Sequence, residues 1–305
     1  MTEAGAQRVV VATFARRPDL LAKVFEPEIL SAVPEFMRHD PAAALYYGEG
    51  ELGHYLDYGL VAVDPTEADR PVARAFNVPF AFPDGAAGQE SFPDGGWDEV
   101  IRWAYRARLA QVRPTALSAL EIMVAPRLQG QGVARVMLAA LRANARRLGF
   151  AELYAPLRPT DKQREPLTPF ADYVARRRDD GLPHDSWVRT HLRLGARILK
   201  VASCSMVIAG TLAKWRRWTG LPLAQTGPTL VPGALSPGPC LARAGSRGLC
   251  RAQSVGASSA RLIAFNGKNN VSCRAAGPNR DDLCPITGRN SGDVVKIAPR
   301  EAACD

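Results

Sequence analysis

The sequence predicts an α/β protein built around a strand, a glycine turn, a helix and a second strand. Residues 116–124 form an apolar stretch of strand character. Residues 133–148 repeat apolar side chains at three- and four-residue steps, which is the pattern of a helix with one buried face. Gly149 is a suitable helix stop, and residues 150–156 are the next expected strand. Strand, helix and strand in this order predict a β-α-β unit.

Antiparallel strands are expected before this unit, with helices on both sides of it in the sequence. Residues 60–63 and 71–80 are apolar stretches around a polar loop, which predicts an antiparallel hairpin. Asp40 precedes Pro41 and is a suitable N-cap for a helix that ends near Tyr47. A strand is expected at 8–14 and an insertion at 158–183. Helices are expected at 20–25, 28–36, 98–111, 169–178, 187–194 and 211–218. Residues 195–209 are expected to belong to the same folded domain.

The composition is that of an ordinary globular chain. It has 305 residues, 47% of them hydrophobic, enough for one large or two small domains. No apolar run is long enough to cross a bilayer and no signal peptide is read, so we expect a cytoplasmic protein with no membrane partner.

The net charge of the chain is +9, but the residues from Pro237 onward hold ten Lys or Arg against five Asp or Glu. This leaves a net charge of +4 for the preceding residues. No basic stretch carries interleaved aromatic residues, so we expect no nucleic-acid partner.

The glycine turn between residues 124 and 133 is an expected anion site. Gly130 and Gly132 allow a sharp turn and a close approach of backbone N–H groups to an anion. These donors lie at the start of the expected helix, where the positive end of the helix dipole favours a pyrophosphate. The dinucleotide fingerprint needs a small residue where Arg135 stands, and no Gly-Lys-Ser/Thr follows at P-loop spacing, so neither of those sites is predicted.

The turn also carries a family resemblance. Arg127-Leu128-Gln129-Gly130-Gln131-Gly132 fits the Q/R-x-x-G-x-G/A motif of the GNAT (Gcn5-related) N-acetyltransferase superfamily, which the chain resembles over about residues 8–236. A likeness to actinobacterial GNAT-like proteins is carried by segments such as Trp97-Asp98, Ala119-Leu120-Glu121-Ile122 and Trp218-Thr219-Gly220-Leu221-Pro222. The resemblance implies the GNAT fold, a mixed and mostly antiparallel sheet that splays at the acyl-CoA site and is flanked by helices.

The same resemblance implies an N-acyltransferase that moves an acetyl or longer acyl group from CoA to an amine by direct attack. Acetyl-CoA or another acyl-CoA would be the co-substrate, a small-molecule or protein amine the acceptor, and a homodimer a candidate assembly. By position, the pantetheine arm would meet Ile122, Met123 and Val124, and the pyrophosphate would meet Gln129, Gly130, Gln131, Gly132, Val133 and Ala134. The alternative is a non-catalytic acyl-CoA-binding or regulatory protein.

Glu121 is the candidate catalytic residue. It is a carboxylate in an otherwise apolar strand, and related enzymes often carry a general-base Glu in this strand. Burial there would raise its pKa towards the useful range, although a structural salt bridge would also account for it. The acid for the leaving thiolate stays open among four titratable residues, Tyr154, Tyr173, His184 and His191.

The sequence changes character at Pro237, which divides a GNAT domain at 1–236 from an irregular, disordered tail expected at 237–305. Five of the six cysteines lie in the tail without a C-x-x-C pair, so no metal site is predicted and reduced thiols are expected.

The tail can also be read in another frame. One codon choice for Cys250 to Ser259, read from its second base, encodes V-E-P-K-V-W-V-R-H. This resembles V-E-P-N-V-W-V-R-H, the closing strand of the actinobacterial GNAT-like proteins. We therefore hypothesise a frameshift near Pro237, with a genuine disordered tail as the alternative. Sequencing the gene tests this, because a shifted frame without such a strand rejects it.

Overall fold

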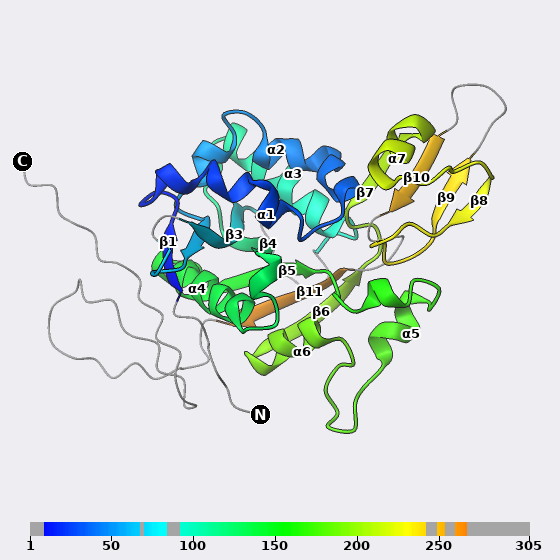
Figure 1. The fold of residues 1–305 in the computed structure, drawn as a ribbon. Helices are drawn as coiled ribbons and strands as arrows, with labels where there is room; N and C mark the ends of the chain where they lie inside the picture. The colour runs from blue at the N-terminus through cyan, green and yellow to red at the C-terminus, as the bar shows by residue number, and fades with distance from the viewer. Residues whose placement is uncertain (1–8, 68–69, 84–91, 242–248, 254–259, 267–305) are drawn as a thin grey trace, which may run out of the picture.

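The computed structural model describes residues 9–67, 70–83, 92–241, 249–253 and 260–266 (Figure 1). Its main sheet has seven strands in the order β1-β2-β3-β4-β5-β11-β6. These strands are β1 Val10–Thr13, β2 Leu60–Val63, β3 Pro71–Phe80, β4 Ala116–Val124, β5 Glu152–Leu157, β6 Ala196–Ala202 and β11 Ala260–Asn266. Every neighbouring pair is antiparallel except β4 with β5, so the sheet is mixed and mostly antiparallel, as expected.

The sheet splays between β4 and β5. The two strands are parallel, but their pairing consists of Leu117 with Leu153 and Ser118 with Tyr154, near the start of each strand. Beyond Ser118, β4 remains paired to β3 as far as Val124, while β5 turns to pair with β11. The β5-facing backbone edge of residues 119–124 therefore has no strand partner in the described part of the chain, and the predicted splay is confirmed.

Helices cover both faces of the sheet (Figure 1). On one face lie α1 Pro27–Leu30, α2 Ala44–Tyr47 and α3 Gly96–Leu109, with short 3-10 helices at Pro18–Leu20, Lys23–Phe25, Glu35–His39, Pro41–Ala43 and Leu52–Tyr55. Their core is aromatic and includes Phe14, Tyr46, Phe76, Phe80 and Trp97. On the other face lies α4 Val133–Arg147, whose core is aliphatic and includes Leu117, Val133, Met137 and Leu141. The sheet thus separates two cores of different composition.

A second sheet, of order β7-β10-β9-β8, packs beside α7 at the upper right of Figure 1. Its strands are β7 Val207–Thr211, β8 Gly227–Thr229, β9 Gly238–Leu241 and β10 Leu249–Gln253, and the remaining helices are α5 Phe170–Ala175, α6 Ser186–Arg193 and α7 Leu212–Thr219. Asp40, Asp185 and Thr211 cap the N-termini that follow them by accepting hydrogen bonds from backbone N–H groups.

Several expected segments differ in the structure. The helix expected over 20–25 is a 3-10 helix at Lys23–Phe25, and the helix expected over 169–178 ends at Ala175. The helix expected over 28–36 is split into α1 and a 3-10 helix, because Pro34 cannot continue the backbone hydrogen-bond pattern. Residues 195–209 form two strands in different sheets, with a turn at 203–206 in which Met206 has a φ of 53°. This turn brings residues 205–207 against the start of α3, where Ser205 Oγ accepts a hydrogen bond from Trp97 N.

The segment beyond Pro237 also contains strands where an irregular tail was expected. The backbone of β11 lies between β5 and β6 and pairs with both, and β10 pairs with β7. Unpaired strand edges attract extended backbone, and Ile263 and Phe265 are strand-favouring residues. Residues 254–259, part of the segment with the alternative reading frame, and residues 267–305 lie outside the described part of the chain. The frameshift hypothesis and the domain boundary stay predictions.

Candidate active site

A β-bulge in β4 shapes the centre of the site. Phe76 of β3 pairs with Glu121 while the next residue, Asn77, pairs with Ala119, so Leu120 is the extra residue on β4. The carbonyl of Leu120 accepts a hydrogen bond of 3.0 Å from the indole Nε1 of Trp97, at the start of α3. Leu120 packs in the aromatic core, and the following side chain, Glu121, lies on this same face of the sheet, next to Arg74 and Tyr47.

Glu121 is held in a largely buried position. Its side chain is 16% exposed, and its Oε1 lies 2.7 Å from Nε of Arg74, which is itself 4% exposed. Neither of these two atoms makes a directional hydrogen bond among the described residues, so their contact is a pairing of charges. Burial raises the pKa of Glu121, and the positive charge of Arg74 opposes that rise. The result is a carboxylate whose proton affinity is set by two opposing effects.

The three residues after Glu121 lie where β4 diverges from β5. The β5-facing backbone edge of residues 122–124 is called the unpaired lip of the splay. Ile122, Met123 and Val124 pair with β3 on one side, opposite Ala75, Arg74 and Ala73. The Met123 side chain packs towards the aromatic core, whereas Ile122 and Val124 pack towards α4. Their backbone groups on the β5 side have no strand partner in the described residues, which leaves an edge that an extended ligand can join.

The glycine turn leads directly from this lip into α4. Gly130 and Gly132 have φ values of 77° and 85°, in the left-handed region where glycine carries no strain. A Cβ at either position would meet nothing within 4 Å, so the space above the turn is open. The α4 ladder begins with Arg135 and Val136, whose N–H groups donate to Gly132 O. The N–H groups before them are those that a helix leaves for a cap or an anion.

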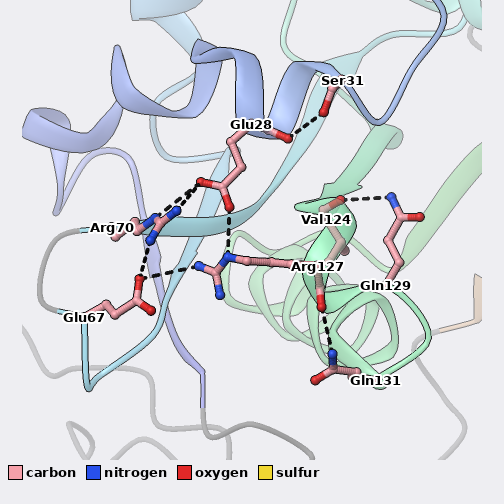
Figure 2. A network of polar contacts seen from close by, with 8 residues as sticks. All are labelled: Glu28, Ser31, Glu67, Arg70, Val124, Arg127, Gln129 and Gln131. Carbon is pink, nitrogen blue, oxygen red and sulfur yellow. Dashed lines mark hydrogen bonds and ion pairs between the residues drawn. The ribbon is translucent and has the colours of Figure 1, made fainter.

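Side-chain amides hold the turn in shape, as Figure 2 shows. Gln129 Nε2 donates to Val124 O at 3.1 Å, which closes the turn onto the end of β4. Gln131 Nε2 donates to Arg127 O at 2.8 Å. Both bonds use side chains to satisfy backbone carbonyls, and the N–H groups of Gln129 and Gln131 donate to Pro126 O and Leu128 O. Among the described residues, this leaves the N–H groups of Gly130, Gly132, Val133 and Ala134 without a backbone acceptor.

Arg127 anchors the turn to the first helices (Figure 2). Its Nε lies 2.8 Å from Glu28 Oε1 on α1, and its Nη2 lies 3.6 Å from Glu67 on the β2–β3 loop. Arg70 contacts the same two carboxylates at 3.0 and 2.8 Å. Two Arg and two Glu residues thus form a charge-balanced cluster that joins α1, the hairpin loop and the glycine turn.

The candidate acids are engaged elsewhere. The Tyr154 hydroxyl donates to Glu152, and the Tyr173 hydroxyl donates to Asp185 at 3.0 Å. His191 is buried, has Nδ1 2.9 Å from Trp187 O, and has a pKa lowered to about 4 by burial. The His184 ring packs edge-on against Tyr173. These contacts give each group a structural role, and the leaving-group acid stays unassigned.

Two residues of the site were not singled out by the sequence reasoning. Arg74 is the one charged residue in the apolar 71–80 stretch, just as Glu121 is in 116–124, and this symmetry was a usable signal. Tyr47 lies beside the Glu121 carboxylate from α2, and nothing in the local sequence indicates that contact. Within the described residues, no group of three or more His, Cys, Asp or Glu side chains is arranged to hold a metal ion. No helix of the described chain has the length and apolar character of a membrane span.

Comparison with known proteins places these features in a family. No protein-family model matches the chain. Arginine N-acetyltransferase avaD from Aspergillus versicolor is 33% identical over 227 residues, covering 70% of this chain and 76% of that protein. The loading GNATL domain of CurA from Lyngbya majuscula is similar in fold, with a TM-score of 0.51, 12% identity, and coverage of 86% of this chain and 99% of that one. The likeness to an actinobacterial group stays a prediction. The extended similarity to an N-acetyltransferase, together with the splayed sheet and the glycine turn, shows that the chain belongs to the GNAT superfamily as an acyl-CoA-dependent N-acetyltransferase.

Proposed function

We propose that Glu121 is the general base of the transferase and that the acceptor is a small-molecule amine, with arginine as the first candidate. The observation that carries the assignment is a buried carboxylate at the β4 bulge, next to the unpaired lip of the splay. Its Oε1 is buried against Nε of Arg74 at 2.7 Å, while the side chain as a whole keeps 16% of its surface exposed. The fungal relative, named as an arginine N-acetyltransferase, supports the choice of acceptor.

The chemistry required of Glu121 is removal of one proton. An amine acceptor is an ammonium ion near neutral pH and must lose a proton before its nitrogen can attack a thioester carbonyl. The carboxylate of Glu121 takes that proton, a C–N bond forms, and the C–S bond breaks. The nitrogen loses its second proton as the amide forms, and the CoA thiolate, which leaves with the sulfur electron pair, takes up a proton in its place. A base with a pKa raised by burial is better matched to this task than an exposed carboxylate.

We assign the acyl-CoA contacts as the sequence suggests. The backbone of Ile122, Met123 and Val124 would bind the pantetheine arm in the manner of an added strand. The turn and helix start, Gln129, Gly130, Gln131, Gly132, Val133 and Ala134, would surround the pyrophosphate, with the backbone N–H groups of Gly130, Gly132, Val133 and Ala134 as the donors. The open space above Gly130 and Gly132 supports this assignment.

Acetyl-CoA turnover with a panel of amines tests the proposal. The panel contains arginine, agmatine, a polyamine and a lysine-containing peptide, and thiol release is measured for each. Arginine or another small amine is expected to support turnover; release with the peptide alone would reject the small-molecule assignment. A protein acceptor and a homodimer stay predictions, and light scattering of the purified chain measures the second.

Glu121→Gln tests the base. The variant removes the proton-accepting group at nearly constant volume, so kcat is expected to fall by about 10² to 10⁴ while acetyl-CoA binding is retained. Glu49→Gln is the matched control, because Glu49 is exposed and lies outside the site. Turnover that survives in Glu121→Gln at the level of the control would reject the assignment.

A further inference from the structure

We propose that Arg74 is a positioning residue that fixes the Glu121 carboxylate beside the splay and keeps it ionised, so that it can accept a proton. This inference rests on the proposed role of Glu121 as the base. It concerns a second residue, on a different strand, for which the family resemblance and the comparisons assign no role.

The side chain of Arg74 is fixed from three sides. Its Nη1 donates to the carbonyl of Val24 at 3.0 Å, and its guanidinium lies 4.4 Å from the centre of the Phe25 ring. It also lies 5.6 Å from the centre of the Phe76 ring. A guanidinium held by a carbonyl and two aromatic faces has little freedom to reorient. Its Nε is therefore a fixed charge at 2.7 Å from Glu121 Oε1.

The difference in exposure shows which partner a substrate can reach. The Arg74 side chain is 4% exposed and the Glu121 side chain 16%. Glu121 is the more exposed member of the pair, and its Oε1 is buried against the guanidinium. Arg74 therefore acts on the acceptor through Glu121 and does not contact it directly.

The groups that face Glu121 set its ionisation. Arg74 on β3 contributes a permanent positive charge, because arginine stays protonated in proteins. From α2, Tyr47 and Tyr46 face the carboxylate, and burial together with the Glu121 charge raises the pKa of both phenols, so they remain neutral. Arg74 is thus the single cation among the described groups that face Glu121. Without it, burial alone would favour the protonated carboxyl, which cannot accept a proton.

Arg74→Met tests the inference through the pH dependence of kcat/KM. Loss of the guanidinium removes the effect that lowers the Glu121 pKa, so the acid limb of the profile is expected to move to higher pH. If the acid limb moves up by one pH unit, kcat/KM measured at a pH below the limb falls about tenfold. At a pH above the limb, kcat/KM recovers. Arg74→Lys keeps a charge but not the fork of donors, and is expected to restore the position of the limb better than it restores kcat. Arg106→Met, an exposed position on α3, is the matched control.

A direct titration covers the case in which Arg74→Met does not fold. In the wild-type chain with 13C-labelled glutamate, Glu121 is expected to be ionised at pH 7, with its resonance assigned by Glu121→Gln. A protonated Glu121 at pH 7, or an acid limb unmoved in Arg74→Met, would overturn the inference while leaving the Glu121→Gln result intact. Turnover that survives in Glu121→Gln would instead reject the role of Glu121 as the base. The effect of Arg74 on the ionisation of Glu121 would still be given by the titration.

Discussion

Asp40 and Asp98 form a buried carboxyl pair whose titration should govern stability near neutral pH. Asp40 is 4% exposed and caps a 3-10 helix by accepting from Ala42 N at 2.8 Å. Asp98 is 3% exposed and accepts from Met206 N and Val207 N. Burial, followed by the charge of Asp98, raises the pKa of Asp40 from 3.8 to about 7. The perturbation is Asp40→Asn, which keeps the capping oxygen and removes the charge.

The sign and size follow from proton linkage. The folded chain binds the Asp40 proton more tightly than the unfolded chain, so this contribution to stability is full below about pH 4. It is lost as the pH rises towards the folded pKa of about 7. At about 1.4 kcal/mol per pH unit, the interval from 3.8 to about 7 corresponds to a loss on the order of 4 kcal/mol. The asparagine does not titrate, so the variant should avoid this loss.

Urea denaturation at several pH values between 4.5 and 8 provides the assay. The free energy of unfolding of Asp40→Asn is expected to exceed that of the wild type by roughly 2 to 4 kcal/mol at pH 8, and to differ by less than about 1 kcal/mol at pH 4.5. Asp179→Asn, at an exposed position, is the control and should follow the wild type. If Asp40→Asn and the wild type lose stability in parallel over this range, the carboxyl pair is not the cause and the reasoning is wrong.

Two further predictions concern the glycine turn and a buried lysine. Gly132→Ala places a Cβ at a φ of 85° in open space, so it should cost about 1 kcal/mol of stability and raise the KM for acetyl-CoA several-fold; an unchanged KM would argue against a pyrophosphate at this turn. Lys162 is fully buried and its Nζ donates to Glu165 O at 2.7 Å and Leu235 O at 2.6 Å. Lys162→Met leaves both carbonyls without this donor and should lower the free energy of unfolding by about 3 kcal/mol in urea; a loss under about 1 kcal/mol would contradict that estimate.

The strand and helix next to the site were predictable because their local residue patterns match the burial that each has in the folded chain. The strand at 116–124 has the predicted bounds, since apolar residues are bounded by a loop and a glycine turn. Helix α4 begins at the predicted residue and ends one residue before the predicted end. It was predictable because its amphipathic repeat faces the sheet and because Gly149 follows it. The strand at 260–266 was not predicted, because its place depends on the pairing needs of β5 and β6, which are distant in sequence.

The bulge and its partners could not be predicted for a different reason. Residues 119–122 read as an uninterrupted strand, and nothing local shows that Leu120 is the extra residue. Its position depends on the register with Phe76 and Asn77 and on the Trp97 indole that binds the Leu120 carbonyl. The Arg74–Glu121 contact depends on the same register. Sequence reasoning found the carboxylate but not the cation beside it.

The β4 bulge explains why the proposed base and the proposed CoA groove occur together. An extra residue in one strand bends it and increases its twist. Here the pairing of β4 with β5 ends at Ser118, two residues before Leu120, so the divergence of the strands begins where the bulge begins. The bulge also places Leu120 and then Glu121 on the face that carries Arg74. One inserted residue therefore opens the edge proposed for pantetheine and presents the carboxylate at its start, so a substitution that removes the bulge should disturb acyl-CoA binding and proton transfer together.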